Sequence, residues 1–205
     1  MKEVSMDNKK SIIFLILIVI IVIITLILVI NKKEVNKVSD GEKFAESYTE
    51  LTSDNVFVYR NSEEIINILS HGTGAVLLGF PSCPWCQRYV VYLNEVAKEL
   101  DIDKIYYYDI YEDRKNNTDT YIKIIEILGD NVRYDNEGNK RIYVPYLVGV
   151  NEGKIVGFND ETSYDTKGFE TPEEYYKEND PSILKESIEE ILTLSNPNIC
   201  SSCNK

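Results

Sequence analysis

Residues 74–86 read Gly-Ala-Val-Leu-Leu-Gly-Phe-Pro-Ser-Cys-Pro-Trp-Cys, and this stretch decides the fold. Its first seven residues, 74–80, are continuously apolar and bounded by turn residues, a pattern typical of a strand buried on both faces. Residues 86–100 then carry apolar side chains at helical spacing. We therefore expect a central strand followed by a helix whose first turn holds Cys83 and Cys86.

Further strands and helices on both sides of this unit indicate an α/β domain. Strands are expected at 56–59, 104–110, 146–150 and 154–158, and helices at 44–51, 62–71, 120–128 and from Pro181 onward. Ser62 is the expected capping residue of its helix. Asn151-Glu152-Gly153 is a hairpin signature between the last two strands. The polar segment 160–180, punctuated by Gly and Pro, is expected to be a surface excursion.

Composition narrows the class of function. The chain has 205 residues and a formal net charge of -12 at pH 7. This charge disfavours nucleic acid binding, which draws on clustered Lys and Arg. The acidic residues are spread over many segments, which is typical of a soluble, self-repelling surface and identifies no partner. The chain without its apolar N-terminal segment has the length of one globular domain.

The N-terminal segment 12–30 is apolar apart from Thr25. A helix of this length can cross a bilayer core of about 30 Å, so we expect a transmembrane helix. A buried helix of a soluble domain is one alternative, but such helices are rarely apolar on every face. A cleaved signal peptide is the other, although its apolar region is usually about 7 to 15 residues and ends in small residues. We place a short tail at 1–11 and a polar tether at 31–41.

Charge does not decide the orientation of this segment, because lysines flank it on both sides. They are Lys2, Lys9 and Lys10 before it and Lys32, Lys33, Lys37 and Lys43 after it. Long domains can be translocated largely regardless of flanking charge, and a short N-terminal tail before one span is the usual signal-anchor arrangement. We therefore expect a single-pass protein of the cell membrane with a cytoplasmic N-terminus and an extracytoplasmic globular domain.

The order of motifs resembles the thioredoxin superfamily over about residues 55–194. The cysteine pair sits after a strand and before a helix, and Pro84 lies between the cysteines. Val144-Pro145 falls at the cis-proline position of that family, and the hairpin follows directly. Cys-x-x-Cys alone is weaker evidence, because zinc knuckles use the same spacing. The resemblance implies a thioredoxin-like domain over 42–194, with a mixed central sheet flanked by helices.

Within this superfamily, the chain is similar to the membrane-anchored thioredoxin-like proteins of Gram-positive bacteria, including those called bacteriocin transport accessory proteins. The similarity rests on the N-terminal anchor, the acidic body and the Cys-Pro-x-Cys site. It implies a thiol-disulfide oxidoreductase without cofactor or metal. Its expected partners are proteins or peptides that carry a disulfide or a thiol, and a membrane or extracytoplasmic redox partner that regenerates it.

The chemistry of the cysteines follows from their place at a helix N-terminus. A thiolate attacks a disulfide, and the helix contributes about half a positive charge that favours the anion. By the resemblance, Cys83 is the nucleophile and Cys86 the resolving thiol. Pro84 stiffens the site or simply starts the helix. Trp85 covers the sulfurs, touches a client, or packs on a neighbouring loop.

By the same resemblance, the Val144-Pro145 peptide bond is cis and lies beside the cysteines, and the Val144 backbone pairs with an extended client chain. An ordinary trans turn proline is the alternative. One position departs from the family: thioredoxins proper bury an acidic residue in the strand beneath the site, and Leu77 stands there. Proton transfer to Cys86 then needs water or another group.

A second pair, Cys200 and Cys203, lies in the tail 195–205, which we expect to be mobile. One hypothesis is a redox relay to Cys83, favoured by a high effective concentration. The alternatives are a disulfide within the tail, thiols without a role, and a zinc ion shared by the two pairs.

Three functions compete. They are an enzyme that exchanges client disulfides, a non-catalytic accessory module that holds an exported peptide beside Pro145, and a zinc-stabilised structural domain. We favour the enzyme. Pro84 and Trp85 carry no titrating group that would indicate the direction of electron flow, and of the two directions we favour reduction of clients.

Overall fold

The computed structural model describes residues 4–34, 38–163 and 168–197. The chain divides into two compact units, residues 1–39 and residues 40–205.

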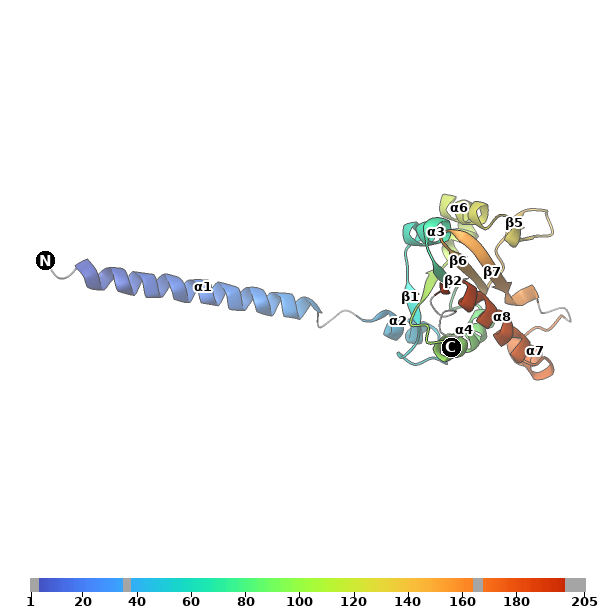
Figure 1. The fold of residues 1–205 in the computed structure, drawn as a ribbon, viewed down its shortest axis with the longest axis horizontal. Helices are drawn as coiled ribbons and strands as arrows, with labels where there is room; N and C mark the ends of the chain where they lie inside the picture. Colours follow the sequence, from blue (N-terminus) through green and yellow to red (C-terminus); the bar gives the residue numbers. More distant parts are fainter. Residues whose placement is uncertain (1–3, 35–37, 164–167, 198–205) are drawn as a thin grey trace. The chain divides into compact units, whose positions relative to one another are not determined.

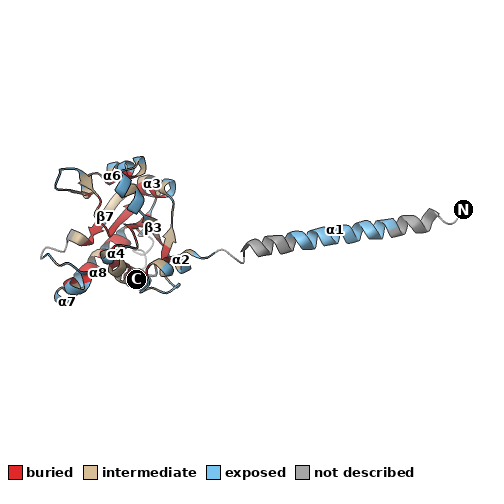
Figure 2. Ribbon diagram, turned by 180° about the vertical axis from the view of Figure 1, so that it is seen from behind, coloured by how far each residue is buried: buried red, intermediate tan, exposed pale blue. Residues whose placement is uncertain are grey.

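The first unit contains one long helix, α1 (Val4–Glu34). Side chains are described for its residues 11–26, and all of them are exposed (Figure 2). Among the described residues, no helix combines the length and apolar character needed to cross a membrane. The spanning role expected for residues 12–30 therefore stays a prediction.

The second unit is built around a five-stranded mixed sheet in the order β1-β3-β2-β6-β7 (Figure 1). β1, β3 and β2 are parallel, whereas β6 and β7 add antiparallel pairs. Every residue of β2 is buried, as expected for the strand at the centre. The strands span Phe57–Tyr59 (β1), Gly74–Gly79 (β2), Ile105–Asp109 (β3), Tyr146–Asn151 (β6) and Lys154–Asp160 (β7). The predicted α/β domain with a mixed central sheet is confirmed.

Helices cover both faces of the sheet: α3 and α6 pack together on one face, and α4 and α8 on the other (Figure 1). Helix α8 packs closely on the sheet. A side chain at Gly149 in β6 would collide with Ile191 of this helix. The helices span Asp40–Ser47 (α2), Ser62–His71 (α3), Pro84–Glu99 (α4), Tyr111–Asn116 (α5), Asp119–Leu128 (α6), Pro172–Glu178 (α7) and Ser182–Leu194 (α8).

Helix α3 begins with a capping box. The Asn61 side chain accepts the backbone N–H of Glu64, and the Glu64 carboxylate accepts the backbone N–H of Asn61, both at 2.9 Å. Two otherwise unpaired donors are satisfied in this way. The prediction that Ser62 caps this helix is wrong, because Ser62 is already its first helical residue.

A small two-stranded sheet lies outside the main one. It pairs β4 (Arg133–Tyr134) with β5 (Lys140–Arg141). In the connecting turn, one carboxylate oxygen of Asp135 accepts the backbone N–H groups of Glu137 and Asn139. The carboxylate thus replaces backbone partners that the turn cannot supply.

Two helices differ from the expectation. Helix α2 begins at Asp40 and ends at Ser47, several residues earlier than the expected helix at 44–51. Its early start is anchored by the Asp40 carboxylate, which accepts the backbone N–H of Tyr59 in β1 at 3.2 Å. Helix α5 was not expected at all, because its six charged and polar residues have no apolar period.

The expectation of a surface excursion at 160–180 holds for most of the described residues 168–180, which are exposed or half-buried, but not at a few buried positions or for the helix within the segment. Asp160, Glu161 and Tyr175 are buried, and residues 172–178 form helix α7. The physical reason is aromatic content: Tyr175 packs edge-on against Phe169 and against Trp85 of α4. Asp160 is compensated by an ion pair with Arg133 at 3.0 Å.

Candidate active site

Cys83 is the N-cap residue of α4, and Pro84 occupies the start of the helix. The Cys83 sulfur accepts the backbone N–H of Cys86 at 3.2 Å, in the way that a serine or aspartate oxygen caps a helix. Both cysteines are present as free thiols. Cys83 is 7% exposed and Cys86 is 1% exposed, so Cys83 is the thiol nearer to solvent.

The loop between β2 and α4 is held by a residue that the sequence did not single out. The Gln87 side-chain amide donates to the carbonyl oxygens of Pro81 at 2.7 Å and Ser47 at 2.9 Å. It ties the cysteine loop to the end of α2. Gln87 follows Cys86 directly, but nothing in its sequence context indicates this role.

The Val144-Pro145 peptide bond is cis, as predicted. The Cys83 thiol donates to the carbonyl oxygen of Val144 at 3.9 Å, so this loop lies against the first cysteine. The two meet because β6 runs antiparallel to β2: Tyr146, at the start of β6, pairs with Leu78 near the end of β2. Residues 61 positions apart in sequence are therefore brought into contact.

The two thiols have opposite electrostatic environments. A hydrogen bond from the Cys86 thiol lowers the pKa of Cys83, against the effect of burial, and the backbone N–H groups of Cys86 and Trp85 lower it further. Burial raises the pKa of Cys86 well above its ordinary value, and the neighbouring Cys83 raises it more. Cys83 is therefore the thiol that forms a thiolate first.

Arg114, on the unexpected helix α5, adds positive charge to the site. Its charge lowers the pKa of both thiols. Its guanidinium lies over the Phe80 ring, 4.8 Å from the centroid, and donates to the Ile142 carbonyl oxygen at 3.4 Å. Sequence reasoning missed Arg114, because only the folded chain brings α5 beside the cysteines.

A pair of buried tyrosine hydroxyls, Tyr48 from α2 and Tyr107 from β3, lies beside the second thiol. The hydroxyls are 2.9 Å apart. A side chain at Gly79 would lie 3.3 Å from the Cys86 sulfur and 3.7 Å from the Tyr48 hydroxyl, so both groups border the space that this glycine leaves free. Leu77 is buried, as expected for a position in the central strand.

Trp85 contacts Tyr175 of α7, with ring centroids 5.4 Å apart in an edge-to-face arrangement. This geometry corresponds to packing on a neighbouring segment, one of the roles considered for Trp85. Pro84 is exposed at the helix start. Cys200 and Cys203 lie outside the described residues. Over the described part of the chain, no group of three or more His, Cys, Asp or Glu side chains is arranged to hold a metal ion.

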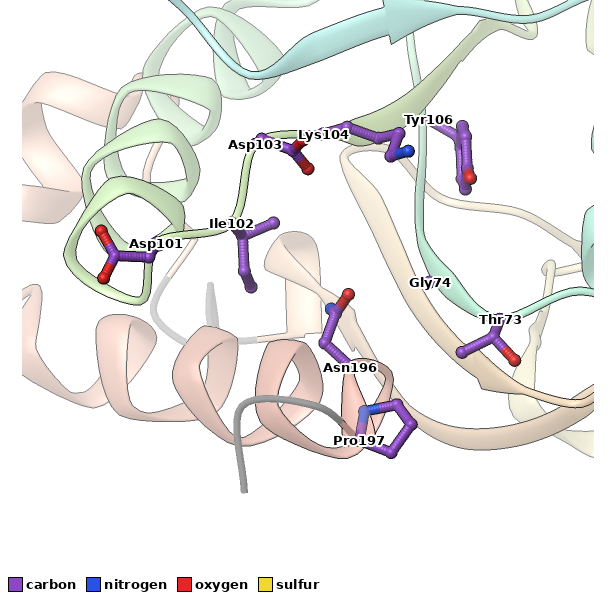
Figure 3. A pocket seen from close by; sticks show the side chains of 9 residues that line it. All are labelled: Thr73, Gly74, Asp101, Ile102, Asp103, Lys104, Tyr106, Asn196 and Pro197. Carbon is purple, nitrogen blue, oxygen red and sulfur yellow. The ribbon is translucent and has the colours of Figure 1, made fainter. Parts of the chain in front are cut away.

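A separate pocket of about 390 Å³ lies at the amino ends of β2 and β3, away from the cysteines. Figure 3 shows Asp101, Asp103 and Lys104 from the α4–β3 connection on one side of it and Asn196 after α8 on another. It contains no thiol, and none of its lining residues contacts the cysteines through a described hydrogen bond. We therefore assign the candidate redox site to the opposite end of the strands.

Comparisons with protein-family models, with curated proteins and with solved structures give no match.

Proposed function

We propose that this chain is a thioredoxin-like thiol-disulfide oxidoreductase in which Cys83 attacks and Cys86 resolves. The observation that carries the proposal is the position of the Cys83 sulfur. It accepts the first-turn N–H of Cys86 at 3.2 Å and lies 3.9 Å from the carbonyl oxygen of Val144 in the cis-proline loop. A thiolate there is stabilised by the helix terminus and stands beside a backbone edge on which a peptide can pair.

The fold supports the thioredoxin-like assignment. Its central sheet has three parallel strands followed by an antiparallel hairpin, with helices on both faces. The cysteine pair follows the central strand, and the cis proline precedes the hairpin. These relations agree with the resemblance seen in the sequence.

In the reducing direction, the Cys83 thiolate attacks one sulfur of a client disulfide. The client S–S bond breaks, a mixed disulfide with Cys83 forms, and the released client thiolate takes up a proton. Cys86 then loses its proton and attacks the Cys83 sulfur, which releases the second client thiol. The client gains two electrons, and the pair becomes a disulfide that a separate thiol donor must reduce.

The opposite shifts in the pKa values of the two thiols fit this sequence of steps. The lowered pKa of Cys83 makes this thiol the one that more readily forms the attacking thiolate. The raised pKa of Cys86 keeps that thiol protonated until the mixed disulfide has formed. The client is a protein or peptide with an accessible disulfide or thiol, and no cofactor takes part.

We also propose that residues 12–30 anchor the protein in the cell membrane and that the second unit acts outside the cytoplasm. Support comes from the apolar side chains of α1, which are exposed along its whole described length. An uncovered apolar surface of this extent is unfavourable in water and favourable in lipid.

Turnover of insulin disulfides by the full-length protein in detergent, with a thiol donor, tests the enzymatic proposal. Replacement of Cys83 by Ala is expected to reduce turnover by at least about a thousandfold, since the nucleophile is lost. Replacement of Cys86 by Ser is expected to accumulate a mixed disulfide at Cys83, detectable as a mass shift. Client binding that persists without turnover in the unaltered protein would favour the accessory module instead.

A further inference from the structure

A groove of about 640 Å³ runs between α6 and the β4–β5 hairpin. Its lining combines two guanidinium groups with aromatic and aliphatic side chains. Prominent among the lining residues are Arg114, Tyr121, Ile125, Tyr134, Asp135 and Arg141. The groove thus offers both charge and apolar surface to a bound chain.

Positive charge predominates in the lining of this groove, where Arg114, Lys140 and Arg141 lie with a single carboxylate, that of Asp135. Burial, and next the charge of Arg141, lowers the pKa of the Arg114 guanidinium, so the two like charges act on one another. Among the described residues, no carboxylate forms an ion pair with either arginine, whereas Lys140 is paired with Asp130. Backbone N–H groups of its own turn, and next to them the charge of Arg141, lower the pKa of the Asp135 carboxyl, so Asp135 offsets part of the positive charge. The remaining excess of positive charge favours the binding of an anion.

Arg114 connects the groove to the redox pair. Arg114 lines the groove and donates to the carbonyl oxygen of Ile142. Two residues further along, the carbonyl oxygen of Val144 accepts the Cys83 thiol. A client chain that lies along residues 142–144, which follow β5 and precede Pro145, would therefore extend from the groove to the attacking sulfur.

We propose that this groove binds an acidic segment of the client chain, with an Asp or Glu carboxylate on Arg114 and Arg141 while the client disulfide faces Cys83. This inference rests on the proposed function and names its class of substrate. Guanidinium groups suit carboxylates because their planar donors can bind both oxygens. The exposed Ile122 and the half-buried Ile125 provide apolar contacts for the residues beside the carboxylate. The net charge of -12 repels an acidic client elsewhere on the protein, so this groove also orients it.

The test uses two peptides with one internal disulfide each, identical except that Glu flanks the cysteine in one and Gln in the other. Pre-reduced full-length protein in detergent is mixed with each peptide, and the rate constant of client reduction is measured. We expect the acidic peptide to react about fivefold to tenfold faster at low salt, and the ratio to fall towards one at high salt.

Replacement of Arg141 by Gln is expected to reduce this ratio to about twofold or less, and Arg141→Lys to retain part of it. Lys104→Gln, at the opposite end of the sheet, is the control and is expected to leave the ratio unchanged. A ratio near one in the unaltered protein, at every salt concentration, would overturn the groove assignment while leaving the redox function intact. Failure to reduce either peptide would instead overturn the proposed function.

A second measurement is independent of the chemistry. Binding of the acidic peptide to the Cys83→Ala variant is followed by fluorescence anisotropy and is expected to be weakened by Arg141→Gln. Competition by free N-acetylglutamate as strong as that by the peptide would show that the groove takes small carboxylates, and would contradict a client-chain site. Weak competition supports the client chain.

Discussion

The two ends of the parallel strands β2 and β3 differ in chemistry. At the carboxyl end lie Cys83 on a helix terminus, the cis-proline loop and the cationic side chain of Arg114. At the amino end lies a pocket with exposed Asp101 and Asp103 and no thiol (Figure 3). The same strands thus have a pair of thiols at one end and no thiol in the pocket at the other end.

Chain direction accounts for the difference. A strand that leads into a helix places the helix N-terminus, with its free N–H groups, at the carboxyl end of the strand. The antiparallel strand β6 begins at this same end, so the loop before it meets the cysteines. At the amino end, by contrast, β6 leads into the turn 151–153, which only connects it to β7. The direction of the strands therefore decides at which end of the sheet the cysteines and the cis-proline loop lie.

The largest expected effect comes from introducing a charge into β2, the strand that joins the two ends. Leu77→Asp is expected to lower the free energy of unfolding by about 3–5 kcal/mol at pH 7, because a carboxylate replaces a fully packed side chain. Burial raises the pKa of such a carboxyl above its unfolded value, so the loss is smaller near pH 5 and grows as the pH rises. Urea unfolding at pH 5 and pH 8 measures it.

Leu77→Asn is the matched control for that experiment, since it is polar but does not titrate. Its loss of stability is expected to be similar at the two pH values. An Asp variant that behaves like the Asn variant would show that the strand interior admits water.

A smaller effect is expected from the tyrosine pair that borders Cys86. Tyr107→Phe leaves the Tyr48 hydroxyl buried without its partner, which costs about 1–3 kcal/mol in the free energy of unfolding. Replacing both tyrosines by Phe is expected to cost less than the two single changes added together, and thermal or urea unfolding checks this. Tyr106→Phe, at the amino end of β3, is the control, because no described residue hydrogen-bonds its hydroxyl. Additive losses would contradict the coupling.

The smallest expected effect concerns the charge of Arg114. Its removal in Arg114→Gln destabilises the Cys83 thiolate, so the pKa of Cys83 rises. The pH midpoint for alkylation of Cys83 by iodoacetamide then moves upward, and the rate below that midpoint falls by about twofold to fivefold. Lys104→Gln, at the amino end, is expected to leave the midpoint unchanged. An unchanged or lower midpoint in the Arg114 variant would place the source of Cys83 activation in the Cys86 thiol and the helix terminus, without Arg114.

The carboxyl end was also the part that sequence reasoning described best. The apolar run 74–80 and the cysteines after it are local signals, and the strand and helix appear where they were expected. The cis state of Pro145 came from the family resemblance. Arg114, Gln87 and Tyr48 were missed, because each reaches the site through tertiary packing of a segment that has no motif of its own. Helix α7 was missed because its polar residues outweighed the aromatic ones that pack it against Trp85.

Helix α2 bears on how the globular unit can be isolated. Phe44 stacks on Phe57 of β1 at 4.1 Å, Asn55 donates to the carbonyl oxygen of Gly41, and Tyr48 reaches the wall of the thiol site. A fragment cut at residue 42, where the domain was expected to begin, would lack both Asp40 and Gly41 and would lose their hydrogen bonds to Tyr59 and Asn55. Fragments intended for crystallisation or kinetics should therefore start upstream of Asp40. Helix α2 then keeps Tyr48 in its position beside the Cys86 sulfur.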